Sequence, residues 1–199
     1  MRIVLVGASG TLGQAVAAEL GQRHDIVPVG RGSGEVRIDI TDPGSIRAGF
    51  ARIGQFDALV SAAGKVKFAP LADMTAADYR IGLDDKLMGQ VDLVLLGRAH
   101  LSDGGSFTLT SGILSRDPIR AGSSASMVNG ALESFVRAAA IELPRGLRIN
   151  AVSPGVLVES MPAYGPFFRG HAPVPAARAA LAFAKSVEGA LTGQVFEIG

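Results

Sequence analysis

The chain has 199 residues, of which 48% are hydrophobic and 19% are charged. This length is typical of one domain, and this composition allows a sizeable buried core and excludes a mainly disordered chain. The 19 Lys and Arg residues nearly balance the 18 Asp and Glu residues, which argues against a nucleic-acid partner. No cysteine is present, so disulfides, thiolate catalysis and Cys-ligated metals are excluded.

The sequence shows no signal for export or for membrane insertion. Its first ten residues form a short apolar run that glycines interrupt, unlike a signal peptide. Apolar stretches stay far below the roughly 18 residues needed to span a bilayer. We therefore expect a cytoplasmic protein without membrane contact. No grouping of His, Asp and Glu has metal-ligand spacing, so no metal site is expected.

Seven short runs rich in Val, Ile and Leu predict strands. They cover residues 3–6, 26–29, 36–40, 58–61, 106–110, 148–152 and 194–198. Most are continuously apolar, as parallel strands covered on both faces are. Because helix-like stretches separate most of them, the sequence predicts an α/β fold, a doubly wound parallel sheet in a single domain spanning residues 1–199.

Two long helices are predicted from apolar residues that recur every three or four positions. One set follows Tyr79 and comprises Leu83, Leu87, Val91 and Leu95; the other follows Val128 and comprises Leu132, Phe135, Val136, Ala139, Ala140 and Leu143. Each set forms one apolar face suited to packing against a core. A further helix start is predicted at Thr41-Asp42-Pro43, where a side chain can cap and proline fits the first turn.

The connection between the second and third predicted strands is unusually short. Only residues 31–35 separate them, whereas a parallel crossover normally takes a dozen or more residues. Five extended residues reach at most about 17 Å. We therefore expect the helix between these strands to be missing or minimal, with either a bare loop or a differently paired third strand.

A glycine-rich turn follows the first predicted strand and precedes a helix-like stretch. It comprises Gly7, Ala8, Ser9, Gly10, Thr11, Leu12 and Gly13. Glycines allow a tight turn whose main-chain N–H groups approach a pyrophosphate, and the helix N-terminus adds partial positive charge. The spacing differs from the dinucleotide fingerprint G-x-G-x-x-G. We predict that Gly7, Ser9, Gly10, Thr11, Leu12 and Gly13 bind a dinucleotide phosphate; the alternative is a turn without a ligand.

The end of the second predicted strand indicates which dinucleotide would bind. It reads Val29-Gly30-Arg31, so no carboxylate is placed to accept from the ribose 2′-OH of NAD. Arg31, with Ser9 and Ser33, could instead hold a 2′-phosphate. NADP is thus predicted over NAD, unless Arg31 is only a solvated loop charge.

Several motifs in order resemble those of short-chain dehydrogenases/reductases, over essentially the whole chain. Beyond the glycine turn, these are Asp39-Ile40, Ser61-Ala62-Ala63-Gly64, Asn150-Ala151-Val152-Ser153-Pro154-Gly155 and the terminal Thr192-Gly193-Gln194. The resemblance implies an NAD(P)-binding Rossmann sheet with strand order 3-2-1-4-5-6-7. It also implies cofactor contacts from Asp39, Ile40, Ala62, Ala63, Gly64, Pro154, Gly155 and Val156.

The catalytic positions depart from the family pattern. Where members carry Tyr-x-x-x-Lys, we align Ser123 and Met127. The family serine falls on Ser111, and the family asparagine of the preceding long helix falls on Lys86. Loss of a general acid alone costs roughly 10²- to 10⁴-fold in rate. We expect Lys86 to supply the missing positive charge and Ser111 to orient a carbonyl; the alternatives are a surface lysine and a serine that only satisfies a strand end.

Residues 159–175 occupy the position of the family's substrate lid. Tyr164 and His171 are the groups there that could replace the missing proton donor, and Tyr164 is taken as a candidate beside Ser123 or water. The alternative is that the aromatic residues simply pack the loop against the body. Glu159 stands where the family often has Thr, and its carboxylate would sit poorly beside a diphosphate.

The prediction is an NADP(H)-dependent oxidoreductase with a rearranged active site, acting on a small carbonyl or alcohol substrate. Two rival hypotheses remain: an NADP(H)-binding sensor or subunit partner without turnover, and a structural oligomer with an empty cofactor groove. The resemblance also implies a homodimer or homotetramer built through the two long helices.

Overall fold

All seven predicted strands form one parallel sheet in the computed structural model, which describes residues 1–199. The order β3-β2-β1-β4-β5-β6-β7 confirms the doubly wound topology. The strands are β1 (Arg2–Val6), β2 (Asp25–Gly30), β3 (Val36–Arg37), β4 (Phe56–Ser61), β5 (Leu101–Thr110), β6 (Arg148–Pro154) and β7 (Val195–Ile198). Since the order reverses between β1 and β4, the carboxyl ends of these two strands border the crevice where such sheets bind ligands.

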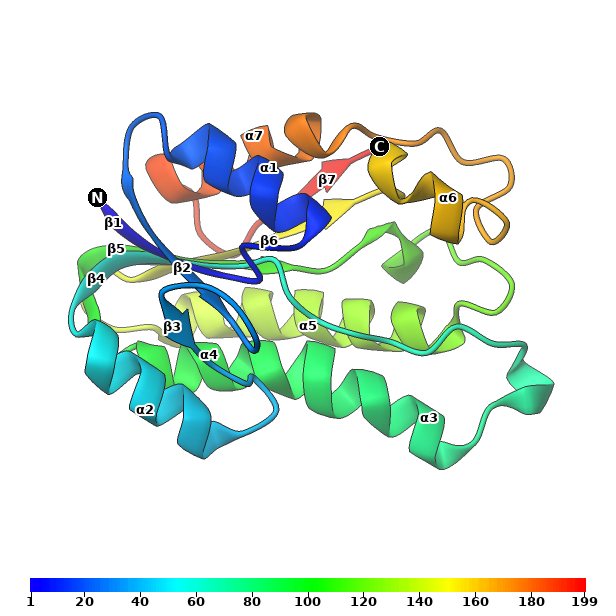
Figure 1. The fold of residues 1–199 in the computed structure, drawn as a ribbon, viewed down its shortest axis with the longest axis horizontal. Helices are drawn as coiled ribbons and strands as arrows, with labels where there is room; N and C mark the ends of the chain where they lie inside the picture. Colours follow the sequence, from blue (N-terminus) through cyan, green and yellow to red (C-terminus); the bar gives the residue numbers. More distant parts are fainter.

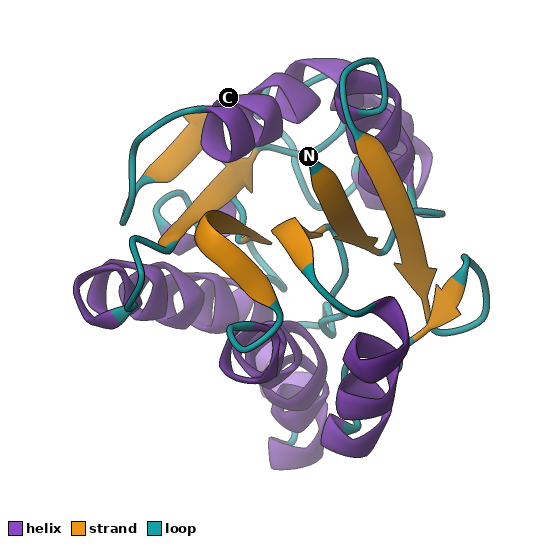
Figure 2. Ribbon diagram, turned by 90° about the vertical axis from the view of Figure 1, so that its left-hand side faces the viewer, coloured by secondary structure: helices purple, strands orange, loops and turns teal.

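Helices cover both faces of the sheet. The α-helices are α1 (Thr11–Leu20), α2 (Pro43–Ile53), α3 (Ala76–Ile81), α4 (Gly89–Gly97), α5 (Ser123–Glu142), α6 (Met161–Tyr164) and α7 (Ala176–Glu188). Shorter turns are η1 (Leu71–Asp73), η3 (Ile113–Ser115) and η4 (Val158–Ser160). Helices α1 and α7 lie on one face, and α2, α4 and α5 lie on the other (Figures 1 and 2). None of the helices combines the length and the apolar character that crossing a bilayer would need.

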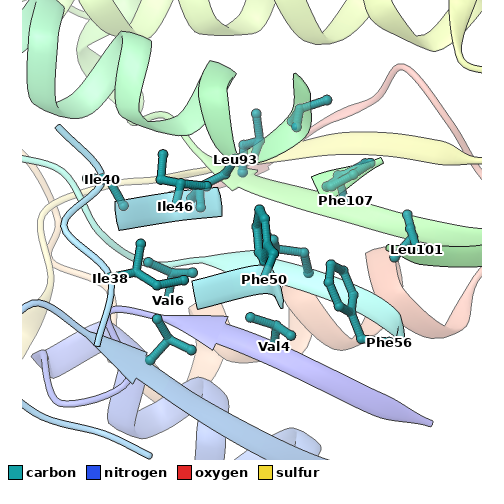
Figure 3. Close-up of a cluster of buried hydrophobic side chains, with 14 of the residues drawn as sticks. Val4, Val6, Ile38, Ile40, Ile46, Phe50, Phe56, Leu93, Leu101 and Phe107 are labelled. Atoms are coloured by element: carbon teal, nitrogen blue, oxygen red, sulfur yellow. The ribbon is translucent and has the colours of Figure 1, made fainter. Parts of the chain in front are cut away.

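Two apolar cores follow from this layering. The larger lies under α2, α4 and α5 and contains 22 buried residues. Its centre is drawn in Figure 3, where Ile46 and Phe50 of α2 and Leu93 of α4 pack onto strand residues such as Val4 and Phe107. A second core of 12 buried residues lies under α1 and α7. Burial on both faces explains why the strands are continuously apolar.

The short connection after β2 contains no helix, as predicted. Residues 31–35 form a loop, and β3 pairs in parallel with β2 through Val29 with Val36 and Gly30 with Arg37. The predicted strand 36–40 is too long, because regular pairing ends at Arg37. Ile38 and Ile40 are nevertheless buried against the larger core. Ile38 and Ile40 are apolar because they are buried, and the hydrogen-bonded strand is shorter than the apolar run that predicted it.

The first of the two predicted long helices contains a widened segment. Between α3 and α4 the backbone adopts π-helical geometry over η2 (Gly82–Met88). The three elements follow one another without a break from Ala76 to Gly97. Such insertions into α-helices often occur at functional sites, and η2 contains Lys86, one of the predicted site residues.

Candidate functional site

The glycine turn after β1 leaves the N-terminus of α1 open. Helix α1 begins at Thr11 after Gly10, and no side chain caps it. The first N–H groups of a helix have no partner within the helix, so they remain available to an anion. Gly7 has φ +85°, and a Cβ there would lie 2.8 Å from the main chain of Ala62. A Cβ at Gly13 would overlap the carbonyl oxygen of Gly7. Both positions therefore require glycine.

A cleft of about 380 Å³ opens beside this turn. Seven of the predicted cofactor residues line it: Gly7, Ser9, Arg31, Asp39, Ile40, Ala63 and Gly64. Gly10, Thr11, Leu12 and Gly13 form the adjoining turn and start of α1, and Ala62 packs directly against Gly7. A cradle of main-chain donors next to a cleft of this size fits the diphosphate and adenosine part of a dinucleotide.

The far end of the cleft carries the groups that we expect to distinguish NADP from NAD. Ser33 Oγ donates to Ser9 Oγ at 3.1 Å, and Arg31 is exposed beside them. Asp39 lies across the cleft, where the hydroxyl and the main-chain N–H of Thr41 donate to its Oδ1 and lower the pKa of the carboxyl. No carboxylate stands at the tip of β2, where the residues are Gly30 and Arg31.

A second, smaller cavity of about 210 Å³ continues from the first, and Gly64 lines both. Three further predicted cofactor residues line it: Pro154, Gly155 and Val156. Among its 17 lining residues, only Lys86 and Tyr164 carry titratable side chains. The carboxyl ends of β4, β5 and β6 therefore form a mostly apolar chamber with a single ammonium group.

Lys86 enters this cavity from the π-helical segment η2. Its Nζ donates to the carbonyl oxygen of Ser111 at 3.0 Å, which is its only hydrogen bond within the chain. Desolvation by burial lowers the pKa of Lys86 from 10.5 to about 8. The side-chain stem lies against Gly64, where a Cβ would be 2.6 Å from Lys86 Cγ. The structure thus places Lys86 in the second cavity, with its stem against Gly64, the residue that lines both cavities.

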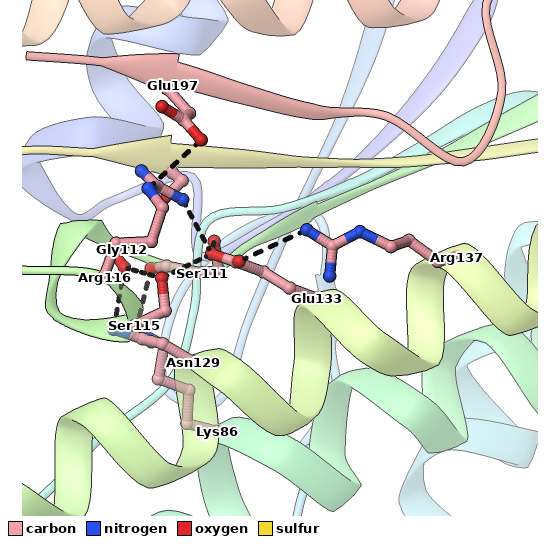
Figure 4. Close-up of polar contacts among 10 residues, drawn as sticks. Lys86, Ser111, Gly112, Ser115, Arg116, Asn129, Glu133, Arg137 and Glu197 are labelled. Atoms are coloured by element: carbon pink, nitrogen blue, oxygen red, sulfur yellow. Dashed lines mark hydrogen bonds and ion pairs between the residues drawn. The ribbon is translucent and has the colours of Figure 1, made fainter.

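Ser111 is buried at the end of β5, and its hydroxyl points to α5. Its Oγ donates to Glu133 Oε1 at 2.9 Å, and Ser115 Oγ donates to the same oxygen at 2.7 Å (Figure 4). Arg116 approaches this carboxylate at 3.4 Å and links it to Glu197 of β7 at 3.1 Å. The hydroxyl of Ser111 therefore donates its proton to Glu133 and not to a group in the cavity. The sequence did not predict Glu133 as a partner of Ser111.

The structure corrects which residues of α5 face the cavity. Ser123 does not line it, and its hydroxyl is 2.8 Å from the hydroxyl of Tyr79 of α3. Met127 is 41% exposed. The cavity is lined instead by Ala125 and Asn129, which have the same four-residue spacing. Ala125 and Asn129, and not Ser123 and Met127, are thus the α5 residues that line the cavity at the spacing of the family's Tyr-x-x-x-Lys.

Asn129 is a buried polar residue whose amide is only half satisfied. Its Nδ2 donates to the carbonyl oxygen of Gly112 at 3.2 Å, while its Oδ1 is buried without a partner. A Cβ at Gly112 would lie 2.9 Å from this Nδ2, so glycine makes room for the amide. Lys86 and Asn129 extend from different helices toward adjacent main-chain carbonyls, those of Ser111 and Gly112 (Figure 4).

The lid segment contributes one of its two candidate proton donors to the cavity. Tyr164 lines the cavity, and its ring packs edge-on against Phe68. His171 instead lies 3.5 Å from Asp117 and does not line the cavity. Both carboxylate oxygens of Glu159 accept from the main-chain N–H of Ala176, the first residue of α7. Glu159 therefore caps a helix and lines neither cavity.

Comparisons with known proteins agree with this geometry. A family model described as enoyl-(acyl carrier protein) reductase matches residues 1–198. The protein lin1944 from Listeria innocua is 50% identical, and its crystal structure superposes with a TM-score of 0.99 over 100% of both chains. A small-chain dehydrogenase crystallised with NADPH is 26% identical, with a TM-score of 0.88 over 100% of this chain and 96% of that one.

An uncharacterised oxidoreductase from Methylorubrum extorquens is 27% identical over 179 residues, which cover 78% of this chain and 72% of the relative. The family match spans nearly the whole chain, and the parallel sheet with its glycine turn has the architecture of its structural neighbours. This chain is therefore a member of the short-chain dehydrogenase/reductase family of oxidoreductases.

Proposed function

We propose that the protein is an NADP(H)-dependent oxidoreductase that interconverts a small carbonyl compound and its alcohol in a rearranged active site. The observation that carries this proposal is a pair of neighbouring cavities that share Gly64: the larger is lined by the glycine turn before the uncapped start of α1, and the smaller is lined by Lys86. The similar dehydrogenase crystallised with NADPH supports the choice of a nicotinamide dinucleotide.

Preference for NADP is inferred from the tip of β2. Arg31 and the hydrogen-bonded pair Ser9 and Ser33 lie together there; the carboxylates that line the same cleft, Asp39 and Asp85, belong to other segments and not to the tip of β2. Guanidinium and hydroxyl groups are suitable partners for a phosphate dianion. The main-chain N–H groups at the start of α1 would hold the diphosphate, and Pro154, Gly155 and Val156 would border the nicotinamide end.

The second, smaller cavity, called the inner cavity from here on, would host the reacting carbonyl. When bound, NADPH supplies the hydride that reduces a carbonyl carbon. Lys86 would stabilise the negative charge that develops on the substrate oxygen, because its ammonium faces a mostly apolar cavity where electrostatic interactions are strong. Tyr164, which lines the same cavity, is positioned to contact substrate from the lid side. Ser123 is left out of this assignment because it lies outside the cavity.

Thermal shift with NADPH and with NADH tests the cofactor claim. A ligand present at 100 times its dissociation constant adds about 2.7 kcal/mol to the free energy of unfolding, which for a chain of this size raises Tm by roughly 5 to 10 °C. We expect this rise with NADPH and a smaller one with NADH. Oxidation of NADPH with a panel of small ketones and aldehydes then tests turnover. The absence of a thermal shift with either nucleotide would contradict the proposal.

The second candidate function is NADP(H) binding without turnover, as a sensor or a subunit partner. A specific observation favours it: Ala125 and Asn129 occupy the cavity-facing positions of α5, so neither a phenol nor an ammonium enters from that helix. A clear thermal shift with NADPH, together with no NADPH oxidation across the carbonyl panel, would select this function.

We also propose that a second copy of the chain covers the long helices. Met88, at the end of η2, and Leu95 of α4 are seven residues apart and are 43% and 45% exposed; Ile81 of α3 and Ile141 of α5 are 44% and 88% exposed. Large apolar side chains gathered on neighbouring helices are typical of a protein interface. The arrangement supports a homodimer or homotetramer.

A further inference from the structure

Lys86 has no counter-ion within the chain. Its Nζ donates to the uncharged carbonyl oxygen of Ser111 at 3.0 Å, and it takes part in none of the ion pairs of the chain. The adjacent Asp85 lines the larger cavity and accepts from the main-chain N–H of Lys65 at 2.8 Å. A cation in a mostly apolar cavity without an anion costs free energy, so a bound anion would stabilise it.

The polar side chains of the inner cavity offer mainly hydrogen-bond donors. An ammonium has three N–H groups, and Ser111 engages one of those of Lys86, so two remain for a ligand. Lys86 is partly accessible and lines the cavity. The lid adds the hydroxyl groups of Ser160 and Tyr164, which line the cavity and form no hydrogen bond within the chain. Since no carboxylate lines the cavity, these donors favour a ligand that is rich in acceptors.

Size and lining restrict the rest of the ligand. The inner cavity has a volume of about 210 Å³, which is small for a binding site. Its apolar walls include Val66, Leu114, Val156 and Phe168, and Lys86 is the only cation that lines it. The nicotinamide end of the cofactor would border the same cavity. The substrate should therefore be a short compound with one anionic group and an apolar remainder.

The position of the anion on the substrate follows from the single ammonium. The proposed reaction already places the reacting carbonyl oxygen at Lys86, so the anion must reach the same group. A carboxylate bonded directly to the carbonyl carbon does so, because one of its oxygens and the carbonyl oxygen lie side by side and match the two remaining N–H groups. A carboxylate further along the substrate would need a second cation, and none lines the cavity.

We propose that Lys86 recognises a 2-oxo acid through both its carbonyl oxygen and its carboxylate, so that the substrates are short, apolar 2-oxo acids and the corresponding 2-hydroxy acids. This inference rests on the proposed oxidoreductase function and names its substrate class. Lys86 is thereby both the proton donor and the residue that selects anionic substrates.

The chemistry of the step agrees with this assignment. In reduction, the carbonyl carbon of the 2-oxo acid gains the hydride of the bound nicotinamide, which becomes oxidised, and the carbonyl oxygen takes one proton from Lys86 Nζ. The product is a 2-hydroxy acid. Hydride transfer leaves a positive charge on the nicotinamide as Lys86 gives up its own, so the carboxylate keeps a cation beside it. The neutral amine of Lys86 then regains a proton from water.

Matched substrates test the proposal in the unaltered protein. Initial rates of NADPH oxidation are compared for 2-oxopentanoate, its methyl ester and the isomer 4-oxopentanoate. Esterification removes the charge but makes the carbonyl carbon more electrophilic, so a preference for the acid must come from the protein. We expect kcat/KM for 2-oxopentanoate to exceed both others by about 10- to 100-fold, because each of the others lacks the carboxylate at Lys86. An equal value for the ester or for 4-oxopentanoate would overturn the proposal while leaving the oxidoreductase function intact.

Variants locate the preference at Lys86. Lys86→Gln keeps a hydrogen-bond donor but removes the charge, so the ratio of kcat/KM for the acid to that for its methyl ester should fall below about threefold. Lys67→Gln is the matched control, because Lys67 is exposed and lies between two residues that line the cavity, Val66 and Phe68. This control should keep the ratio. Retention of the full preference in a folded Lys86→Gln would refute the assignment.

A binding measurement decides the question if no 2-oxo acid is turned over. The acid 2-hydroxypentanoate and the neutral 2-hydroxypentanamide are compared as ligands by thermal shift, in the presence of NADP and at equal ionic strength. We expect a larger rise in Tm with the acid, and this difference should disappear in Lys86→Gln and persist in Lys67→Gln. Such a result without turnover would remove the catalytic function and keep the recognition site. Equal shifts with the acid and the amide would remove the recognition site.

Discussion

Lys86 Nζ donates to the carbonyl oxygen of Ser111 at 3.0 Å, so the ammonium of the inner cavity is held by a neutral main-chain group. No carboxylate forms an ion pair with it, and burial lowers the pKa of Lys86 to about 8. An amine with a pKa near the working pH can both hold and release a proton. In the proposed function, Lys86 on η2, held by this contact, supplies the positive charge that no residue of α5 supplies.

Activity should depend on pH through Lys86. Reduction needs the protonated ammonium, so kcat/KM should be level below pH 8 and fall about tenfold per pH unit above it. Lys86→Met should lower kcat/KM by roughly 10²- to 10⁴-fold. The profile is measured at saturating NADPH, with the dissociation constant of NADPH followed in parallel. A rate that stays constant to pH 10 would exclude Lys86 as the titrating group.

The free energy of unfolding should rise with pH because of Lys86, whereas the activity should fall. The pKa of Lys86 is lower in the folded chain than in the unfolded chain, so the unfolded chain binds more protons between about pH 8 and 10.5. The cost of burying the charge is therefore fully present below pH 8 and is lost as the pH rises toward 10.5. A shift of this size corresponds to at most about 3.4 kcal/mol.

Lys86→Met removes that cost but leaves the Ser111 carbonyl without its donor. We compare the free energy of unfolding of Lys86→Met with that of the unaltered protein. The difference should favour the variant most at pH 7, and it should fall by about 1 to 3 kcal/mol by pH 10.5. Urea denaturation at the two pH values measures this, with Lys67→Met, an exposed lysine, as the control. A difference that does not change with pH would show that burial does not shift the pKa of Lys86.

The sheet could be predicted from the sequence because its signal is local. Continuous apolar runs mark strands buried on both faces, and the glycine turn marks the end of β1. The error in β3 has the same origin: Ile38 and Ile40 are buried but lie beyond the paired residues. Hydrophobicity reports the burial of a residue and does not report its hydrogen-bond partner.

The face of α5 that lines the inner cavity could have been predicted better. Val128, Leu132 and Val136 are fully buried and define the inner face of this helix. Helical periodicity places Ala125 and Asn129 next to that face and turns Met127 away from it. Aligning the family motif on Ser123 and Met127 ignored this periodicity. By contrast, the hydrogen bonds from Ser111 to Glu133 and from Ala176 to Glu159 join residues that are far apart in the sequence. No local sequence pattern predicts them.

Arg31 should control the choice between the two nicotinamide dinucleotides. Arg31→Glu replaces the cation at the tip of β2 by a carboxylate that repels a 2′-phosphate and accepts from a 2′-hydroxyl. The dissociation constant of NADPH should rise by about 10- to 100-fold, with a much smaller change for NADH. Fluorescence titration with both nucleotides measures this, and Arg47→Glu on the exposed side of α2 is the control. Equal weakening of NADPH and NADH would contradict the assignment of NADP.

Glu159 should contribute to stability and not to cofactor binding. Its carboxylate accepts from the N–H of Ala176 at 3.0 and 3.1 Å, at the start of α7. Glu159→Ala should therefore lower the free energy of unfolding by about 0.5 to 2 kcal/mol, as loss of a helix cap does. Thermal denaturation and NADPH titration are both measured. Tighter NADPH binding in this variant would indicate that the carboxylate reaches the diphosphate site, contrary to its position in the structure.

The exposed apolar residues of the long helices should determine the oligomeric state. A carboxylate at Leu95 would have to be buried without a partner if a second copy covers this face, which costs several kcal/mol. Leu95→Glu should therefore shift the protein toward smaller species in size-exclusion chromatography with light scattering. Leu71→Glu is the control, because Leu71 is 70% exposed but lies in the separate turn η1. If Leu95→Glu has the same molar mass as the unaltered protein, or if the unaltered protein is a monomer, no second copy covers these helices.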